Sequence, residues 1–503
     1  MDFCLLIAAV TISLVVRFIF IKFSSSNAVD HYYWILVTRL FRKKFSLPVR
    51  LEGKYLLESD KMAYPIGFGL FLSLFSEKFL RSSKSKYVTT VIDLMALIPL
   101  SAIGMELNLN LAGFSAMIIV YGLAPILVSY NTQLTSRSLG NLFLLFSLCC
   151  QFFAVVEAQY FSLLYLFFGI IFLTATLVTH KMTTQFYIFL LPGWIYSLHL
   201  LGGYGATIAA ISPLLAIVLA FLVTGFKYQK LQWIAHWDIV SFWNRNWRFL
   251  GAHQFRHSEI YGKPSERDSS TFHKKGTKGV LKHCSLLFAH LPAVYFLPMY
   301  VFFEEPVPLI IATPIIIAML LAASTLLLQP LRCLGGGHLY LFNAVPFVSL
   351  AWGVLLTTHS HSMPLIAIFS MSISLTLLSL YLGSRKRKAA SSPNSKNLNL
   401  VIKKLSNMRK QNIAVFPVTY AEIIALETEH SVFWGGHGLG FRELEPFWPI
   451  MRKRVSVALS SYNISTIILD LDFWPEGGEV LAVESGDSQP KRYGNFLVYE
   501  VSQ

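Results

Sequence analysis

Charged residues are scarce in this 503-residue chain. Only 14% of the residues are Asp, Glu, Lys or Arg, whereas 54% are hydrophobic, and the mean hydropathy is +0.55. A soluble globular protein needs more charge on its surface than this. The composition therefore excludes a soluble enzyme and indicates a multi-pass membrane protein.

Cysteine and the common catalytic signatures are also sparse or missing. The five cysteines lie in or beside apolar runs without a CxxC spacing, so they indicate neither a disulfide framework nor a zinc site. The sequence contains no HExxH motif, no P-loop and no Ser-His-Asp order. The glycine-rich run 435–441 follows a predicted strand but lacks the G-x-G-x-x-G spacing onto a helix, which argues against a nucleotide site.

The charge that is present is strongly basic. Lys and Arg number 42 against 27 Asp and Glu, giving a formal net charge of +15. These basic groups adjoin apolar runs and do not form one domain. Phospholipid headgroups or a phosphate-bearing substrate are therefore favoured as partners over nucleic acid.

Long apolar runs predict about eleven membrane crossings within residues 1–384, or about twelve if the run 66–80 also crosses. The run 66–80 is short, so we expect a partial-depth helix there. The crossings are expected at 3–23, 88–105, 110–128, 139–157, 160–178, 183–200, 204–226, 285–303, 307–328, 338–357 and 362–384.

The chain divides into a transmembrane domain, 1–384, and a smaller soluble part. Within the former, the first loop, 24–65, carries a basic amphipathic segment typical of interfacial helices. Segment 227–284 spaces tryptophans helically among basic residues, which indicates a helix at the headgroup level or one packed on the membrane domain. Residues 385–412 have the composition of a linker. Residues 413–503 alternate strand and helix patterns, which predicts a small soluble α/β domain.

If 66–80 does not cross, nearly every group able to do chemistry lies on one face of the membrane. Asp30 is a carboxylate at the membrane–water boundary, where it could accept a proton as a general base; a solvated or helix-capping role is the alternative. Cationic or hydrogen-bonding groups at helix ends on the same face could clamp a phosphate, whereas snorkelling to the interface is the alternative for each Lys or Arg. These groups are Arg137, His180, Lys181, Arg332 and His338.

Two further carboxylates lie within apolar runs. Asp93 is about one turn inside its predicted crossing, and Glu157 ends another. A charged group in hydrocarbon is costly, so both are candidates for a functional role.

Several short motifs in residues 1–384 together resemble the GT-C superfamily of integral-membrane glycosyltransferases. They are the early Asp30 in the loop after the first helix, Tyr64-Pro65 before an apolar run, the segment 125–140 with Tyr130-Asn131 and Gln133–Gly140, and the segment 331–340 before an Ala-Val-Pro helix. The resemblance implies a polyprenyl-phosphate-linked sugar donor, an inverting transfer and an active site on the non-cytoplasmic face. It maps the family's early acidic residue onto Asp30. The residues expected to bind substrate are His31, Tyr64, Arg137, His180, Lys181, Arg332, His338 and Tyr340.

A metal requirement stays open. Many members of the superfamily have a second acidic residue where this chain has His31. A divalent cation such as Mg²⁺ or Mn²⁺ is therefore an open cofactor, and no residue is assigned as its ligand.

The leading hypothesis is a membrane glycosyltransferase of polysaccharide or cell-envelope biosynthesis, with a glycan, a lipid-linked saccharide or a protein as acceptor. One alternative is a lipid-linked polysaccharide ligase or polymerase of another membrane fold, in which segment 227–284 would hold the key Arg and His and Asp30 would be dispensable. Another is a transporter or flippase for a lipid-linked saccharide. That class predicts paired repeats and mid-membrane charges, and the sequence has no visible repeat and few central charges.

The resemblance and the charge pattern disagree about sidedness. The GT-C orientation puts the active face and the C-terminal domain outside the cytoplasm, yet Lys and Arg usually accumulate in cytoplasmic loops. A crossing at 66–80 would move the later basic loops and the C-terminal domain to the cytoplasm while Asp30 stayed outside. We expect the external orientation, because the resemblance also accounts for the Asp30 loop and the short helix.

Overall fold

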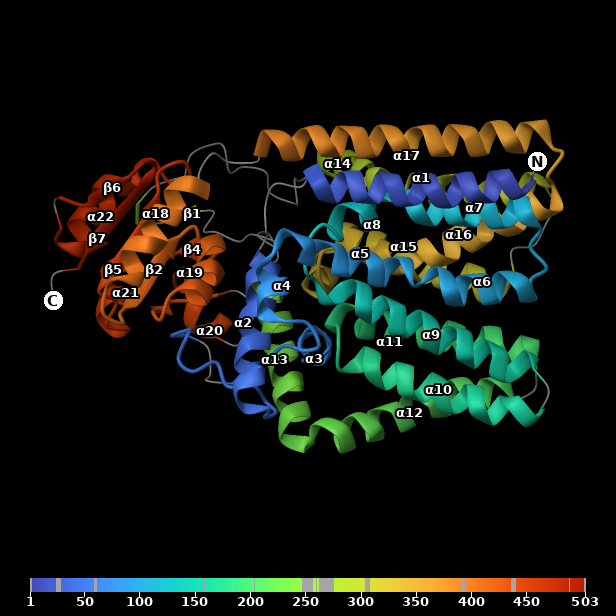
Figure 1. Cartoon of the computed structure of the whole chain (residues 1–503), viewed down its shortest axis with the longest axis horizontal. Coiled ribbons are helices and arrows are strands. Elements are labelled where there is room, and N and C mark those ends of the chain that lie inside the picture. The colour runs from blue at the N-terminus through green and yellow to red at the C-terminus, as the bar shows by residue number, and fades with distance from the viewer. Residues whose placement is uncertain are drawn as a thin grey trace.

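The computed structural model combines a long helical bundle with a sheet domain at one end (Figure 1). The N-terminus lies at the end of the bundle far from the sheet, and the C-terminus lies in the sheet domain. The structure describes residues 2–23, 29–57, 61–157, 159–202, 204–246, 257–258, 260–261, 276–303, 308–390, 395–435, 440–487 and 489–501.

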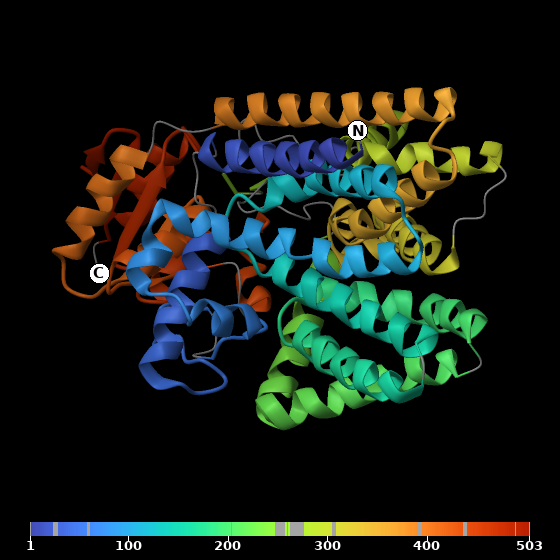
Figure 2. The same ribbon diagram turned by 45° about the vertical axis from the view of Figure 1, so that its right-hand side comes forward.

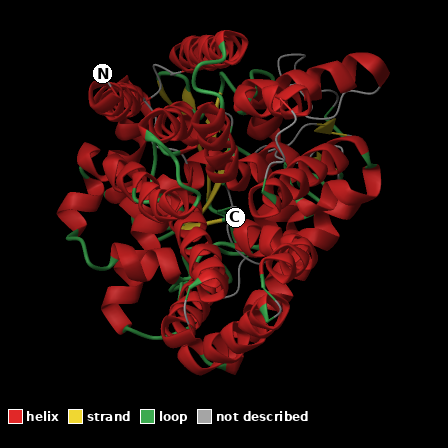
Figure 3. Ribbon diagram, turned by 90° about the vertical axis from the view of Figure 1, so that its right-hand side faces the viewer, coloured by secondary structure: helices red, strands yellow, loops and turns green. Residues whose placement is uncertain are grey.

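Eight described helical segments are long and apolar enough to cross a membrane. They are Phe3–Lys22, Ser83–Glu106, Leu111–Tyr130, Ser136–Val156, Gly205–Thr224, Leu309–Leu327, Gly337–Thr358 and Met363–Arg385. The pair Val280–His290 and Pro292–Pro298, bent by 98°, makes up to nine. Viewed along the bundle, these helices appear nearly end-on, with the strands behind them (Figure 3).

Some of the candidate spans contain a bend and therefore consist of two or more shorter helices. The helices of the bundle are α1 (Asp2–Phe23), α5 (Lys86–Leu94), α6 (Leu97–Glu106), α7 (Leu111–Leu123), α8 (Pro125–Tyr130), α9 (Ser136–Val156), α10 (Gln159–Leu177), α11 (Lys181–Leu201), α12 (Gly205–Thr224), α14 (Gly276–His290), α15 (Leu309–Leu327), α16 (Leu341–Thr358) and α17 (Met363–Ala390), with the 3₁₀ segments η4 (Pro292–Phe303), η5 (Gln329–Leu334) and η6 (Gly337–Tyr340). The apolar helices α10 and α11 link α9 to α12 through short turns and pack beside them. They therefore also run the length of the bundle, in the order that the apolar runs predicted.

A buried ion pair joins α1 to α5. Arg17 Nη1 donates to Asp93 Oδ2, and both side chains are 1% exposed. Arg17 Nε also donates to Gly122 O at 2.9 Å, and the Tyr121 hydroxyl donates to Asp93 Oδ1 at 3.1 Å. Asp93 is thus satisfied inside the bundle, where it holds α1, α5 and α7 together. Glu157 is the residue after α9, at the C-terminal end of that helix, whereas Ser136 begins it.

Two helices lie crosswise where the bundle meets the sheet domain, α2 (Val29–Lys44) and α13 (Phe226–Arg245) (Figure 1). Within segment 227–284, the parts 247–256 and 262–275 lie outside the described residues. The short α3 (Gly67–Leu72) and α4 (Glu77–Arg81) pack on α2 at the same end, followed by η1 (Ser83–Ser85). The run 66–80 therefore forms two short helices at this end of the bundle, and Asp30 shares this end with the sheet domain.

The C-terminal domain is built on a five-stranded sheet in the order β3-β2-β5-β7-β6. Strands β3, β2 and β5 are parallel, whereas β7 runs antiparallel to both β5 and β6. The elements are α18 (Ser395–Ser406), β2 (Asn412–Phe416), η7 (Val418–Tyr420), α19 (Ala421–Glu427), β3 (Ser431–Val432), α20 (Phe441–Leu444), β4 (Ile450–Met451), α21 (Val455–Ser461), β5 (Thr466–Asp470), α22 (Gly477–Ser485), β6 (Lys491–Tyr493) and β7 (Phe496–Glu500). A separate parallel pair joins β4 to β1 (His257–Ser258), which belongs to segment 227–284.

The stretch 385–412 differs from the linker that its composition indicated. Helix α17 continues to Ala390, and α18 covers Ser395–Ser406. The apolar residues of α18 repeat at helical spacing, and Leu398, Val401 and Leu405 are buried. Helix α18 forms because that apolar face packs on the sheet domain.

Candidate active site

The site lies where three helices begin, at the end of the bundle that faces the sheet domain. Asp30 is in the first turn of α2, Arg137 is in the first turn of α9, and His180 and Lys181 open α11. The helices α9 and α11 each contain 21 residues. Their N-termini carry positive partial charge, so an anion would be stabilised here.

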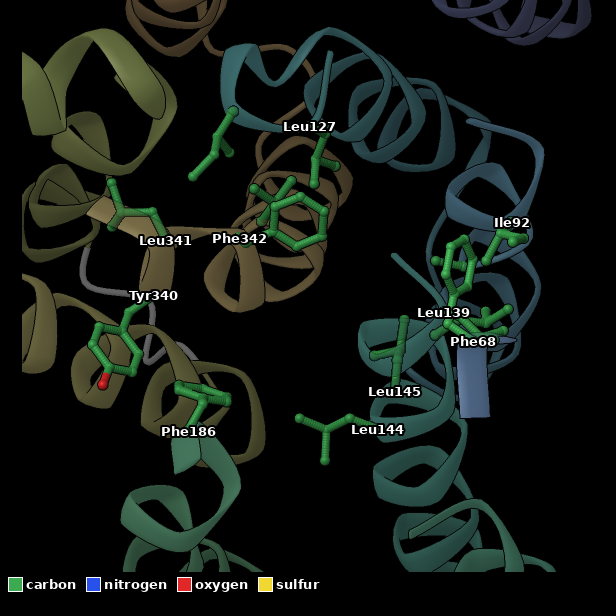
Figure 4. Packing of buried hydrophobic residues seen from close by; sticks show 14 of the residues in the cluster. Phe68, Ile92, Leu127, Leu139, Leu144, Leu145, Phe186, Tyr340, Leu341 and Phe342 are labelled. Atoms are coloured by element: carbon green, nitrogen blue, oxygen red, sulfur yellow. The ribbon is translucent and has the colours of Figure 1, made fainter. Parts of the chain in front are cut away.

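The two helix starts touch. A Cβ added to Gly140 of α9 would lie 2.5 Å from His180 Cβ. Apolar packing holds α9 next to this contact, because the neighbouring Leu139 faces Phe68 and Ile92 (Figure 4). The close approach of α9 and α11 therefore depends on a glycine.

Tyr64 lies close enough to both Asp30 and Arg137 for their charges to affect its pKa. Burial and the charge of Asp30 raise the pKa of Tyr64 to about 12, although a hydrogen bond with Ser136 and the charge of Arg137 oppose this. The phenol is therefore neutral and can donate a hydrogen bond. Lys181 Nζ lies 5.3 Å from the centre of its ring and donates to Ala63 O at 3.1 Å.

Helix α13 fixes the segment that carries Tyr64. Gln232 Nε2 and the Tyr228 hydroxyl each donate to Tyr64 O at 3.3 Å, and the Tyr228 oxygen accepts from Ile66 N at 2.7 Å. Burial and the charge of Lys181 lower the pKa of His236 on the same helix. The predicted amphipathic helix of segment 227–284 thus forms one wall of the site.

His180 is a neutral helix cap, which is a narrower role than a cationic phosphate clamp. Its side chain is buried, and Nδ1 accepts from Thr183 N at 3.2 Å. Burial and the charge of Arg137 lower the pKa of His180 to about 3, against the opposing effect of Asp30. Because Nδ1 accepts, Nε2 carries the proton and remains a hydrogen-bond donor.

Arg137 is held by aromatic rings. The centre of its guanidinium lies 4.9 Å from the Tyr130 ring centroid and 5.8 Å from that of Phe342. Its Nε is buried without a hydrogen-bond partner, and no carboxylate within the described ranges forms an ion pair with it. Phe342 itself is fixed in the apolar core beside Leu127 (Figure 4). The guanidinium is therefore oriented while its donors remain available to an anion.

His338 reaches this cluster through Tyr130. The Tyr130 hydroxyl and His338 Nε2 are hydrogen-bonded at 2.7 Å, and the rings of His290 and His338 lie 4.9 Å apart. Sequence reasoning did not assign Tyr130 or His290 a role. Tyr130 stands in one of the quoted motifs, whereas His290 at the end of α14 carries no sequence signal.

The other predicted residues have different surroundings. Arg332 on η5 donates from Nη2 to Leu326 O at 3.2 Å. The Tyr340 hydroxyl donates to Leu334 O at 3.0 Å and accepts from Gln185 Nε2 at 2.8 Å, which ties η5 and η6 to α11. Burial and the charge of Lys86 lower the pKa of His31 to about 4, so His31 is neutral beside a lysine.

A divalent cation does not fit the donor set of the site. Within the stretches that the structure describes, no three His, Cys, Asp or Glu side chains group closely enough to hold a metal ion. Mg²⁺ and Mn²⁺ prefer several oxygen ligands, whereas this chain has His31 next to Asp30. We therefore derive no step through a metal.

The architecture is the one that the sequence indicated, a multi-pass helical bundle followed by a small α/β domain. No protein-family profile matches the chain, and no curated protein matches it. Solved structures do resemble it. One is the oligosaccharyltransferase of Archaeoglobus fulgidus in complex with Zn and sulfate, with a TM-score of 0.61, 12% identity, and coverage of 96% of this chain and 70% of that one.

Two further solved structures carry lipid phosphates. ArnT from Cupriavidus metallidurans, bound to undecaprenyl phosphate, aligns with a TM-score of 0.58 and 10% identity over 99% of this chain and 98% of that one. The archaeal oligosaccharyltransferase AglB from Archaeoglobus fulgidus, with an inhibitory peptide and a dolichol-phosphate, aligns with a TM-score of 0.58 and 12% identity over 100% and 74%. The likeness spans both the bundle and the sheet domain, and at these identities it establishes the fold.

Proposed function

We propose that this protein is a membrane glycosyltransferase that moves a sugar from a polyprenyl-phosphate-linked donor to a glycan, a lipid-linked saccharide or a protein. One observation carries the proposal. The charges of Asp30 and Arg137 both reach Tyr64 and His180 and shift their pKa values in opposite directions, at the N-termini of two long helices. A base and an anion site are thus close neighbours at the end of a membrane bundle.

Asp30 would act as the general base. It takes the proton from the acceptor group while the acceptor atom forms a bond to the anomeric carbon. The bond between that carbon and the phosphate oxygen breaks, and its electron pair leaves with the phosphate. Attack from the face opposite the leaving group inverts the anomeric configuration.

The cationic side would receive the leaving phosphate. Arg137 supplies a fixed guanidinium, and Lys181 lies beside Tyr64 as a hydrogen-bond donor whose pKa burial lowers to about 7. The N-termini of α9 and α11 add backbone dipoles, and His180 Nε2 and Tyr64 are neutral donors. Charge that develops on the phosphate is stabilised by groups that need no rearrangement.

The comparisons support a lipid-phosphate donor. Among proteins with the same fold, ArnT was solved with undecaprenyl phosphate and AglB with a dolichol-phosphate. The fold also removes the alternative of a ligase built on another membrane fold. In line with the resemblance, we propose that the active face and the C-terminal domain lie outside the cytoplasm.

Replacement of Asp30 by Asn tests the proposal. We expect transfer from a polyprenyl-phosphate-linked sugar by the purified protein to fall by about 10²- to 10⁴-fold, the usual contribution of a positioned base, with unchanged thermal unfolding. Glu106→Gln is the matched control, because Glu106 is an exposed carboxylate at the end of α6. Wild-type transfer by Asp30→Asn would refute the assignment of the base.

A further inference from the structure

The first loop reaches into the sheet of the C-terminal domain. Residues 54–57, the edge segment, lie parallel to β3, with Tyr55 opposite Val432. Backbone hydrogen bonds hold the segment, from Val432 N to Lys54 O at 2.8 Å, from Leu56 N to Val432 O at 2.9 Å and from Leu57 N to Phe433 O at 3.2 Å. The edge segment therefore extends the sheet beyond β3, its edge strand.

Tyr55 carries a buried hydrogen bond into the domain. Its hydroxyl donates to Glu422 Oε2 on α19. The two residues are 3% and 0% exposed, although 367 positions separate them in the sequence. Burying a carboxylate is unfavourable unless hydrogen bonds satisfy it, so the bond from the Tyr55 hydroxyl stabilises Glu422 in its buried position.

Two glycines that follow β3 make room for the edge segment. A Cβ on Gly435 would lie 2.2 Å from Tyr55 Cε1 and 2.7 Å from Glu422 Oε1. A Cβ on Gly440, where φ is +110°, would lie 2.4 Å from Leu57 O. These two glycines therefore serve the contact between the loop and the domain.

The same face of the domain holds α2. Helix α19 packs against α2 (Figure 1), and Arg39 Nη1 of α2 donates to Leu426 O at 3.0 Å. Lys54 Nζ donates to Thr428 O just after α19 at 2.6 Å. Turning the molecule keeps α2 between the bundle and the domain (Figure 2). Helix α2, whose first turn carries Asp30, is thus fixed from the domain side as well as by the bundle.

We propose that Tyr55 and Glu422 are positioning residues for Asp30. Their hydrogen bond fastens the edge segment and α19 into one unit, and that unit fixes the helix on which the base stands. The inference rests on the proposed function. A misplacement of a reacting group by about 1 Å can lower the rate by about 10²-fold, so a remote contact of this kind can limit catalysis.

Kinetics and hydrogen–deuterium exchange of the full-length protein test this together. Tyr55→Phe and Glu422→Ala should lower kcat for transfer by about 10-fold or more and leave KM for the lipid donor within about twofold, because the anion site is on α9 and α11. Both variants should exchange faster in residues 29–44. Glu422→Gln keeps an acceptor for the Tyr55 hydroxyl and should restore both values.

Arg81→Gln is the matched control. Arg81 and Glu427 form an exposed ion pair across the same contact at 2.8 Å, and such pairs contribute little, so this variant should behave as wild type. Unchanged kcat and unchanged exchange of 29–44 in Tyr55→Phe would overturn the inference, as would a parallel loss of donor affinity and kcat. Hydrogen–deuterium exchange is measured without substrate, so it tests the positioning contact independently of the chemistry. A failure of the proposed chemistry would instead appear as wild-type transfer by Asp30→Asn.

Discussion

Loss of the Arg137 guanidinium should weaken lipid-phosphate binding far more than it weakens the fold. The side chain contacts two rings, at 4.9 and 5.8 Å, and the rings stay packed without it. Such cation–π contacts contribute about 0.5–1 kcal/mol each at partly exposed sites, so Arg137→Gln should lower the free energy of unfolding by about 1–2 kcal/mol.

The effect on binding is expected to be larger. A hydrogen bond to a charged group contributes about 1.5–3 kcal/mol, which corresponds to about 10- to 150-fold in Kd for undecaprenyl phosphate. Arg137→Lys keeps the charge but loses the planar fork, so its Kd should lie between those of wild type and Arg137→Gln.

Titration of the detergent-solubilised protein with undecaprenyl phosphate, followed by calorimetry, measures these affinities. Arg245→Gln is a suitable control, because Arg245 is already paired with Glu445 at 2.7 Å on the surface of α13. Equal affinity of wild type and Arg137→Gln for the lipid phosphate would refute the assignment of the anion site.

Three further predictions follow from single features of the structure. Arg17→Met removes the ion-pair partner of the buried Asp93 and should destabilise the protein by about 3–5 kcal/mol in thermal or denaturant unfolding. The same change in an Asp93→Asn background should destabilise it much less. Equal effects in the two backgrounds would exclude the pairing. His180 has a folded pKa of about 3, below its unfolded value of 6.5, so the unfolded state binds more protons between these pH values and the free energy of unfolding falls as the pH drops from 6.5. His180→Asn keeps a helix cap and should reduce this slope by about 1.4 kcal/mol per pH unit. An unchanged slope would show that His180 does not titrate in this way. Cysteines at Lys84 and Val480 should both react with an impermeant maleimide added outside intact cells, and labelling of either one only after lysis would contradict the proposed orientation.

Much of the fold could be predicted from local sequence. Apolar runs of spanning length marked the order of the crossings, and the run 66–80, which is short for a full crossing, became two short helices. The alternating strand and helix patterns of 413–503 became the sheet domain, with residues 413–416 in β2 and 466–470 in β5. These signals depend on composition and periodicity within one segment, and that information is present in the sequence itself.

The candidate site was predictable in part. Polar residues at helix ends on one face pointed to Asp30, Arg137, His180 and Lys181, and the structure brings these together. Their protonation states were not predictable, because the neutral state of His180 results from its burial and from the charge of Arg137. The partner of Asp93, 76 positions away in the sequence, was equally hidden.

Contacts between distant segments account for the remaining differences. The edge segment pairs with a strand that lies more than 370 positions later, and nothing local in residues 54–57 signals this. The composition of 385–412 suggested a linker, because a basic run at 385–388 is followed by Ala, Ser, Pro and Asn residues. The packing of Leu398, Val401 and Leu405 on the sheet domain explains helix α18.

Whether the base and the leaving group share one site is tested by comparing Asp30→Asn with Arg137→Gln in two parallel assays. One assay measures transfer of a sugar from a polyprenyl-phosphate-linked donor, and the other measures binding of undecaprenyl phosphate. We expect Asp30→Asn to bind the lipid phosphate like wild type and to transfer sugar about 10²- to 10⁴-fold more slowly, whereas Arg137→Gln should bind the lipid phosphate weakly. Wild-type transfer by Asp30→Asn, or wild-type affinity in Arg137→Gln, would contradict a shared site for base and leaving group.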